Sequence, residues 1–167
     1  MKTVPCQREC GSCTACCWTL VILELKKPQR QSCRHCSGTS CSIYERRPDS
    51  CRIFKCQWLN GIGEERFRPD RIGIIVDAFE IGPLKKVVFL WEVTADALAK
   101  VETWELSRFF LRLGYHLCHV SADGERCVIY LNPTVPPPNK KIRAKIRTFD
   151  GYTFASIPLP ELEKLAL

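Results

Sequence analysis

The chain of 167 residues lacks any hydrophobic run long enough to cross a membrane. A spanning helix needs about 20 consecutive apolar residues, whereas the longest candidate, residues 20–25, is short and contains Glu24. Residues 1–6 also lack the apolar segment of a secretory signal. These absences argue against a helical membrane protein and predict a cytoplasmic protein without membrane partners.

The sequence also lacks the common catalytic patterns. It has no glycine-rich phosphate loop, no nucleophile within a strand–turn–helix elbow, and no Ser–His–Asp arrangement. The acidic residues Asp77, Glu80, Glu92 and Asp96 fit strand or turn surfaces and form no recognisable acid–base pair. Whether the protein is an enzyme therefore stays open at this point.

Cysteine, by contrast, is abundant and unevenly placed. Ten of the twelve cysteines lie in the first 56 residues, and only Cys118 and Cys127 lie beyond them. A disulfide scaffold spreads its bridges over the fold and forms in an oxidising compartment, whereas crowded Cys-x-x-Cys spacings in a reducing cytosol are typical of metal binding. We therefore favour a metal site, with a disulfide framework as the alternative.

The densest cysteine motif is Cys-x-x-Cys-x-x-Cys-Cys, at residues 10–17. Two residues between cysteines allow a tight turn to direct both sulfurs at one ion about 2.3 Å away. Adjacent Cys16 and Cys17 cannot both bind one tetrahedral ion without strain, so neighbouring sulfurs are expected to serve different metals or to bridge two. The predicted ligands are Cys10, Cys13, Cys16, Cys17, Cys33, Cys36, Cys41, Cys51 and Cys56.

Several arrangements of these ligands fit the spacing. They are two four-cysteine zinc sites, one [4Fe–4S] cluster with a separate structural site, or a polynuclear cluster with bridging sulfurs. Spacing does not choose between zinc and iron. His35 is interpreted as a non-ligand because sulfurs are already in excess, and Cys118 and Cys127 as small packing residues on strands.

The cysteine motifs resemble a known family. The residues that carry the resemblance are Cys10–Cys17, Cys33-Arg34-His35-Cys36, Cys41-Ser-Ile-Tyr44-Glu-Arg-Arg47-Pro48-Asp-Ser-Cys51-Arg52-Ile-Phe54-Lys-Cys56, Trp58-Leu59 and Arg68-Pro69-Asp70-Arg71. Together they look like the CxxCxxCC family of zinc- or iron-chelating, YkgJ-like bacterial proteins. The resemblance implies a metal-binding module without an assigned activity. Some larger relatives are flagellin lysine methylases, which implies metal-dependent redox or group-transfer chemistry as an alternative function; this chain is too short to add a methyl-donor domain.

Positive charge and aromatic residues accompany the cysteines. The formal net charge is +7, and five cations lie within a few residues of a cysteine: Arg34, Arg46, Arg47, Arg52 and Lys55. We interpret them as neutralising thiolates; a nucleic-acid adaptor is the less favoured alternative. Arg47 and Arg52 are predicted to donate to sulfurs or to pair with Asp49, while Tyr44, Phe54 and Trp58 are predicted to exclude water from the thiolates.

The sequence predicts an α+β fold, in which a small metal-stabilised cysteine-rich module packs on an antiparallel sheet with one main helix. Strands are expected over 71–80, 84–94, 115–121 and 126–132, a helix over 95–113, and a further short strand over 18–25. The predicted parts are the cysteine-rich module 1–66, a β-β-α-β-β unit 67–135, and a Pro-rich spacer with a basic tail 136–167. The basic run 140–147 alternates with apolar residues and is interpreted as an edge strand.

Overall fold

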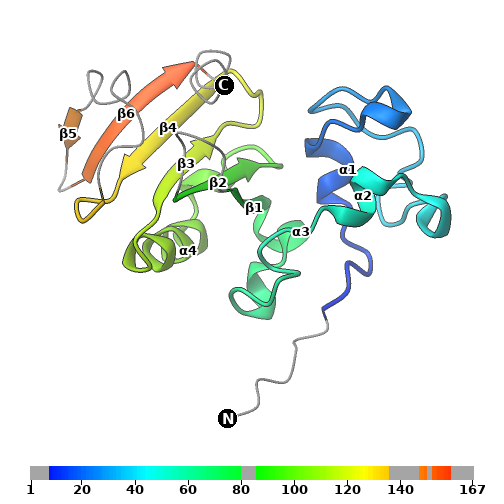
Figure 1. Cartoon of the computed structure of the whole chain (residues 1–167), viewed down its shortest axis with the longest axis horizontal. Coiled ribbons are helices and arrows are strands. Elements are labelled where there is room, and N and C mark those ends of the chain that lie inside the picture. Colours follow the sequence, from blue (N-terminus) through cyan, green and yellow to red (C-terminus); the bar gives the residue numbers. More distant parts are fainter. Residues whose placement is uncertain (1–7, 80–85, 136–146, 150–151, 159–167) are drawn as a thin grey trace, which may run out of the picture.

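A computed structural model describes residues 8–79, 86–135, 147–149 and 152–158 (Figure 1). One part is a six-stranded sheet with the strand order β1-β2-β3-β4-β6-β5, and the other consists of short helices and loops that carry most of the cysteines. The elements are α1 (Ala15–Thr19), η1 (Leu23–Leu25), η2 (Tyr44–Arg46), α2 (Asp49–Ile53), η3 (Glu65–Phe67), α3 (Pro69–Ile72), β1 (Ile74–Phe79), β2 (Val87–Glu92), η5 (Ala97–Ala99), α4 (Val101–Arg112), β3 (His116–Val120), β4 (Arg126–Leu131), β5 (Arg147–Phe149) and β6 (Tyr152–Pro158).

The predicted α+β class with one main helix is confirmed, but the sheet is mixed rather than antiparallel. β2 and β3 run parallel, with Val87 opposite His116, while the other neighbouring strands are antiparallel. Parallel neighbours need a long crossover, and here α4 provides it by returning the chain to the end of the sheet where β2 begins. The β-β-α-β-β order alone did not reveal this crossover.

Two backbone turns make the first strand and the main helix begin later than predicted. Gly73 ends α3 in the left-handed conformation, with φ of 75°, and a Cβ at this position would lie 1.9 Å from Oγ1 of Thr94. Strand β1 therefore begins only at Ile74. Asp96 is also left-handed, and Lys100 is extended, so the helix expected from residue 95 begins at Val101 after a separate turn.

The strand predicted over residues 18–25 is wrong. The segment contains the end of α1 and the short helix η1, and a single antiparallel bridge joins Ile22 to Lys27. The buried Lys27 ammonium donates to the carbonyl oxygens of Trp18, Leu20 and Pro28 and so closes the segment into a loop. The apolar run suggested burial in a sheet, but its Leu23 is 79% exposed.

Part of the predicted edge strand and tail lies outside the described residues. This applies to residues 140–146 of the basic run and to residues 159–167, as well as to Cys6. Arg147, the one described residue of the run, begins β5, which pairs antiparallel with β6 at the edge of the sheet.

Helix α4 covers one face of the sheet. Its Ser107 side chain hydrogen-bonds to Nε2 of buried His119 on β3 at 3.0 Å, and Trp104 contacts the edge of Tyr130 on β4 at a ring distance of 5.1 Å. Leu106 and Phe110 are buried on the same helix. Through these contacts, α4 packs as a helical layer against the central strands of the sheet.

The cysteine-rich part shares this hydrophobic core. In Figure 1, α1 and α2 lie beyond β1, the strand at one edge of the sheet. Ala15, Cys56 and Trp58 belong to the same buried cluster as the sheet residues, and the backbone N–H of Gln57 donates to the carbonyl of Val76 on β1 at 2.8 Å. The candidate site is therefore anchored directly against a sheet edge.

Buried His119 should make stability depend on pH. Burial lowers its pKa from 6.5 to about 4. The unfolded chain then binds a proton that the folded protein does not, so stability is complete above pH 6.5 and falls as the pH drops toward 4. We expect a loss of roughly 3 kcal/mol over this window.

The matched variant is His119→Gln, which keeps a neutral hydrogen-bonding group beside Ser107. Urea denaturation of both proteins between pH 7 and 4 measures the difference in their pH slopes. The variant should show the shallower slope; equal slopes would contradict the assignment of this pH dependence to His119.

Candidate metal centre

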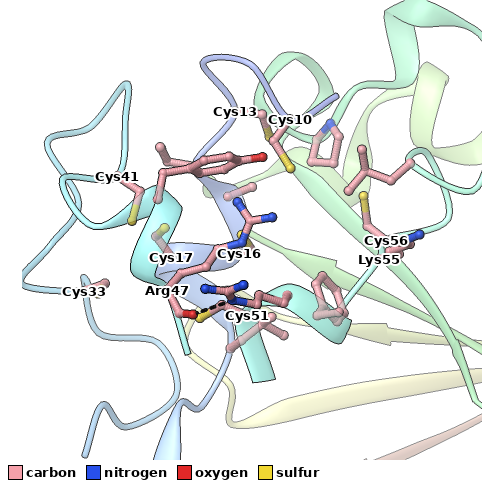
Figure 2. Close-up of a pocket in the computed structure, with 18 of the residues that line it drawn as sticks. Cys10, Cys13, Cys16, Cys17, Cys33, Cys41, Arg47, Cys51, Lys55 and Cys56 are labelled. Carbon is pink, nitrogen blue, oxygen red and sulfur yellow. Dashed lines mark hydrogen bonds between the residues drawn. The ribbon is translucent and has the colours of Figure 1, made fainter. Parts of the chain in front are cut away.

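The cysteine-rich part encloses a cavity of about 540 Å³ (Figure 2). Eight of the nine predicted ligands line it, namely Cys10, Cys13, Cys16, Cys17, Cys33, Cys41, Cys51 and Cys56. The ninth, Cys36, is not among the lining residues. The cavity thus gathers sulfurs from segments up to 46 positions apart in the sequence.

The first four cysteines are placed by a turn and a short helix. The backbone N–H of Cys13 donates to the carbonyl of Cys10 at 2.9 Å, and Gly11 between them is left-handed, with φ of 54°. Cys16 and Cys17 follow on α1, where successive side chains point about 100° apart. The two adjacent side chains therefore leave the helix in different directions, while their sulfurs stay within hydrogen-bonding reach of each other.

The second group is tied to the first by the backbone. The N–H of Cys33 donates to the carbonyl of Cys17 at 3.0 Å. Cys36 and Cys41 form an antiparallel bridge around residues 37–40. The N–H of Gly38 also donates to the sulfur of Cys36 at 3.4 Å. This pattern holds Cys33 and Cys41 at the cavity wall.

Of the last two predicted ligands, Cys51 lies in α2 and Cys56 follows it. The Glu24 carboxylate accepts hydrogen bonds from both the backbone N–H and the hydroxyl of Ser50, at 3.1 and 2.8 Å, and so anchors the first turn of α2. That turn carries Cys51, whereas Cys56 follows the helix and is buried against the sheet. The interaction with Glu24 could not be anticipated from the cysteine spacing.

Several thiols are buried and contact backbone amides. Burial raises the pKa of Cys13, whereas hydrogen bonds from the backbone of Ala15 and Asp70 lower it. Burial likewise raises the pKa of Cys56, opposed by the backbone of Leu59 and Trp58. Amide donors of this kind stabilise a thiolate, which is the form that binds metal.

The sulfurs of α1 interact with one another. The hydrogen bond with Cys16 raises the pKa of Cys17, and burial raises it further, whereas a hydrogen bond from Cys36 lowers it. Without a metal, Cys17 therefore resists ionisation. A bound cation would displace those protons, since metal binding requires the thiolates.

Arg47 is one of the cations that line the cavity. Its guanidinium lies 3.8 Å from the ring centre of Tyr44, and its Nε is buried without a hydrogen-bond partner among the described residues. Burial lowers the pKa of Arg47, but Tyr44, Cys10 and Cys41 outweigh this effect and raise it. Arg47 is therefore close enough to Cys10 and Cys41 to act on them electrostatically, and its predicted hydrogen bonds to sulfur stay a prediction.

Arg52 differs from its prediction. It donates to the backbone carbonyls of Arg47 and Glu45, both at 2.9 Å, rather than to a sulfur or to Asp49. Figure 2 draws the bond to Arg47 as a dashed line. Arg52 therefore orders the loop that presents Arg47.

Sequence reasoning missed the role of Arg8. Its guanidinium lies 4.9 Å from the ring centre of buried Trp58 and donates to the carbonyls of Trp58, Ile62 and Gly63. No pattern in the sequence paired this residue with a segment 50 positions away. Arg8 fixes the loop that follows Cys56.

The motif Arg68-Pro69-Asp70-Arg71 also supports the site. Arg68 pairs with Asp70 at 2.6 Å and donates to the hydroxyl of Ser12, between Cys10 and Cys13, at 2.8 Å. The motif is part of the family resemblance, so the sequence marked these residues, but it did not show that Arg68 contacts Ser12. The ion pair holds the backbone of Asp70 next to the sulfur of Cys13.

The remaining cysteines lie apart from the cavity. Cys118 and Cys127 are fully buried on β3 and β4, and their thiols hydrogen-bond to each other. Burial is the main factor that raises the pKa of Cys118. This environment fits their interpretation as packing residues.

Within the described part of the chain, no three His, Cys, Asp or Glu side chains already form a group that could hold a metal ion. The cavity gathers the sulfurs without bringing them into coordination distance of one point. Binding would require side-chain movements that draw sulfurs together. The donor set fits zinc or iron, which cysteine thiolates bind.

Comparison with known proteins adds no relative. No family model matches the chain, and no curated protein or solved structure matches it. None of the described helices is both long and apolar enough to span a bilayer.

Proposed function

We propose that residues 10–56 bind metal ions through cysteine thiolates and that this centre is the functional element of the protein. The observation that carries the proposal is the convergence of eight cysteines on one cavity. Cysteines that served only for packing would have no reason to line a common cavity. The two cysteines in the sheet are fully buried at 0% exposure, whereas most of the cavity cysteines are partly exposed.

The centre is expected to hold more than one metal ion. A structural zinc site takes four ligands, and the cavity offers eight cysteines in a volume of about 540 Å³. Zinc and iron, including an iron–sulfur cluster, are the candidate metals because thiolates suit both. The nearby cations Arg47 and Lys27 would offset part of the negative charge of the thiolates.

We place this function in the cytoplasm and in the CxxCxxCC family. All eleven described cysteines are free thiols, and free thiols persist in a reducing compartment. The family resemblance supports the same metal-binding role, and the contact of Arg68 and Asp70 with the Cys10–Cys13 turn gives its later motif a structural reason.

Anaerobic purification followed by elemental analysis and visible absorption tests the proposal. We expect at least two equivalents of zinc or iron per chain. Absorption near 400 nm would identify an iron–sulfur centre, because Zn²⁺ is d¹⁰ and colourless. Protein without metal, with its cysteines paired in disulfides, would contradict the proposal.

A further inference from the structure

We propose that the cavity cysteines form two separate four-thiolate metal sites, with Arg47 as a shared neighbouring cation; this inference rests on the metal-binding function proposed above. The sheet-side site consists of Cys10, Cys13, Cys16 and Cys56. The outer site consists of Cys17, Cys33, Cys41 and Cys51. Cys36 supports the outer site without binding its metal.

The sheet-side site is defined by contact with the hydrophobic core. Cys56 belongs to the core, and Cys13 and Cys16 pack against it. Cys10 joins Cys13 through the 2.9 Å backbone hydrogen bond of their turn. Cys13 and Cys10 lie close enough to Cys56 to act on its thiol electrostatically, and Cys10 is also near Cys17 of the outer site.

The outer site lies away from that core. Cys33 is buried but is not part of the core cluster, and its backbone N–H binds the carbonyl of Cys17. Burial raises the pKa of Cys51, followed by the charges of Cys17, Cys33 and Cys41. Among these four, Cys17 and Cys33 are joined by a backbone hydrogen bond, and Figure 2 shows Cys17, Cys33 and Cys41 on the side of the cavity opposite Cys56.

Helix α1 carries one ligand of each site. Cys16 and Cys17 are consecutive residues of this helix, so their side chains are rotated by about 100° from each other, although their thiols hydrogen-bond in the metal-free chain. The adjacent pair can therefore supply one ligand to each site. This arrangement removes the strain that would arise if both bound the same ion.

Arg47 interacts with both sets. The charges acting on its guanidinium include Cys10 of the sheet-side site and Cys41 of the outer site. Figure 2 shows its side chain extending into the cavity among the labelled cysteines. A divalent ion with four thiolates carries a net double negative charge, so a cation beside two such sites reduces their repulsion.

Cys36 occupies a supporting position. It does not line the cavity, its sulfur accepts the backbone N–H of Gly38, and it hydrogen-bonds to Cys17. A serine hydroxyl can also donate to the Cys17 sulfur. Cys36→Ser is therefore a matched control, although its Cys-x-x-Cys spacing with Cys33 predicted a ligand.

Metal counting by native mass spectrometry, on protein purified anaerobically, tests the division. Cys13→Ser/Cys56→Ser should remove the metal of the sheet-side site and keep that of the outer site, and Cys41→Ser/Cys51→Ser should do the reverse. Cys36→Ser should keep both. If either double variant loses all metal while the wild type is loaded, or if Cys36→Ser loses metal, the two-site assignment is wrong but metal binding stands.

The wild type provides a test that does not depend on folding of the variants. Stepwise addition of a chelator should produce a species that has lost the metal of one site only, because the two sites share no ligand. Direct conversion from the fully loaded to the metal-free chain would overturn the division. A wild type that carries no metal at all would overturn both this inference and the proposed function.

Discussion

Removal of the metal is expected to unfold residues 10–56. The two helices of this segment, α1 and α2, have five residues each and no side-chain cap, and helices this short are unstable on their own. Binding free energy in structural zinc sites is on the order of 10 kcal/mol and acts as folding free energy. The metal would thus be the main source of order in the segment.

Hydrogen exchange before and after chelation measures this effect. The amides of Ile22 and Cys33, which bond to Lys27 and Cys17, should lose their protection, as should the Cys10–Cys13 turn. Among single variants, Cys51→Ser should lose metal and stability together. Cys118→Ala should keep the metal and cost only about 1 kcal/mol as a packing change. Unchanged protection after complete metal removal would show that the segment folds without it.

Replacing Trp58 by alanine is expected to destabilise the whole protein by about 3–5 kcal/mol. Trp58 is 6% exposed, belongs to the core shared with the sheet, and stacks under Arg8. The loss should appear in a single denaturation transition, because the cysteine-rich segment and the sheet have a common core. Metal affinity should fall as well, since Cys56 is two residues away.

Trp18→Ala is the matched control for this change. Trp18 is 40% exposed on α1 and outside the core cluster, so its removal should change the free energy of unfolding far less. Chemical denaturation of both variants with metal bound gives the comparison. Equal effects, or a separate early transition for the cysteine-rich segment, would contradict the shared core.

The sequence predicted the elements whose patterns are local. Strands β1 to β4 and helix α4 follow from apolar runs and turn residues, and cysteine spacing singled out eight cysteines that line one cavity. Long-range pairings were not accessible. The parallel alignment of β2 with β3 depends on the path of a crossover, and the contact of Arg8 with Trp58 joins segments that share no local pattern.

In the candidate site, too, sequence spacing predicted which residues are neighbours in the chain, whereas contacts between distant residues came only from the fold. Spacing placed Cys16 and Cys17 together, but only the fold shows that Cys16 packs on the core. The segment 18–25 was misread because its apolar residues suggested a strand, whereas the Lys27 ammonium closes it into a loop. Spacing also counted Cys36 as a ligand, although it does not line the cavity.

X-ray absorption spectroscopy at the metal edge of the anaerobically purified protein tests metal binding by these cysteines most directly. The arrangement of the cavity predicts a first coordination shell dominated by sulfur, at about 2.3 Å from the metal. A first shell made mainly of nitrogen or oxygen atoms would contradict binding by the cavity cysteines.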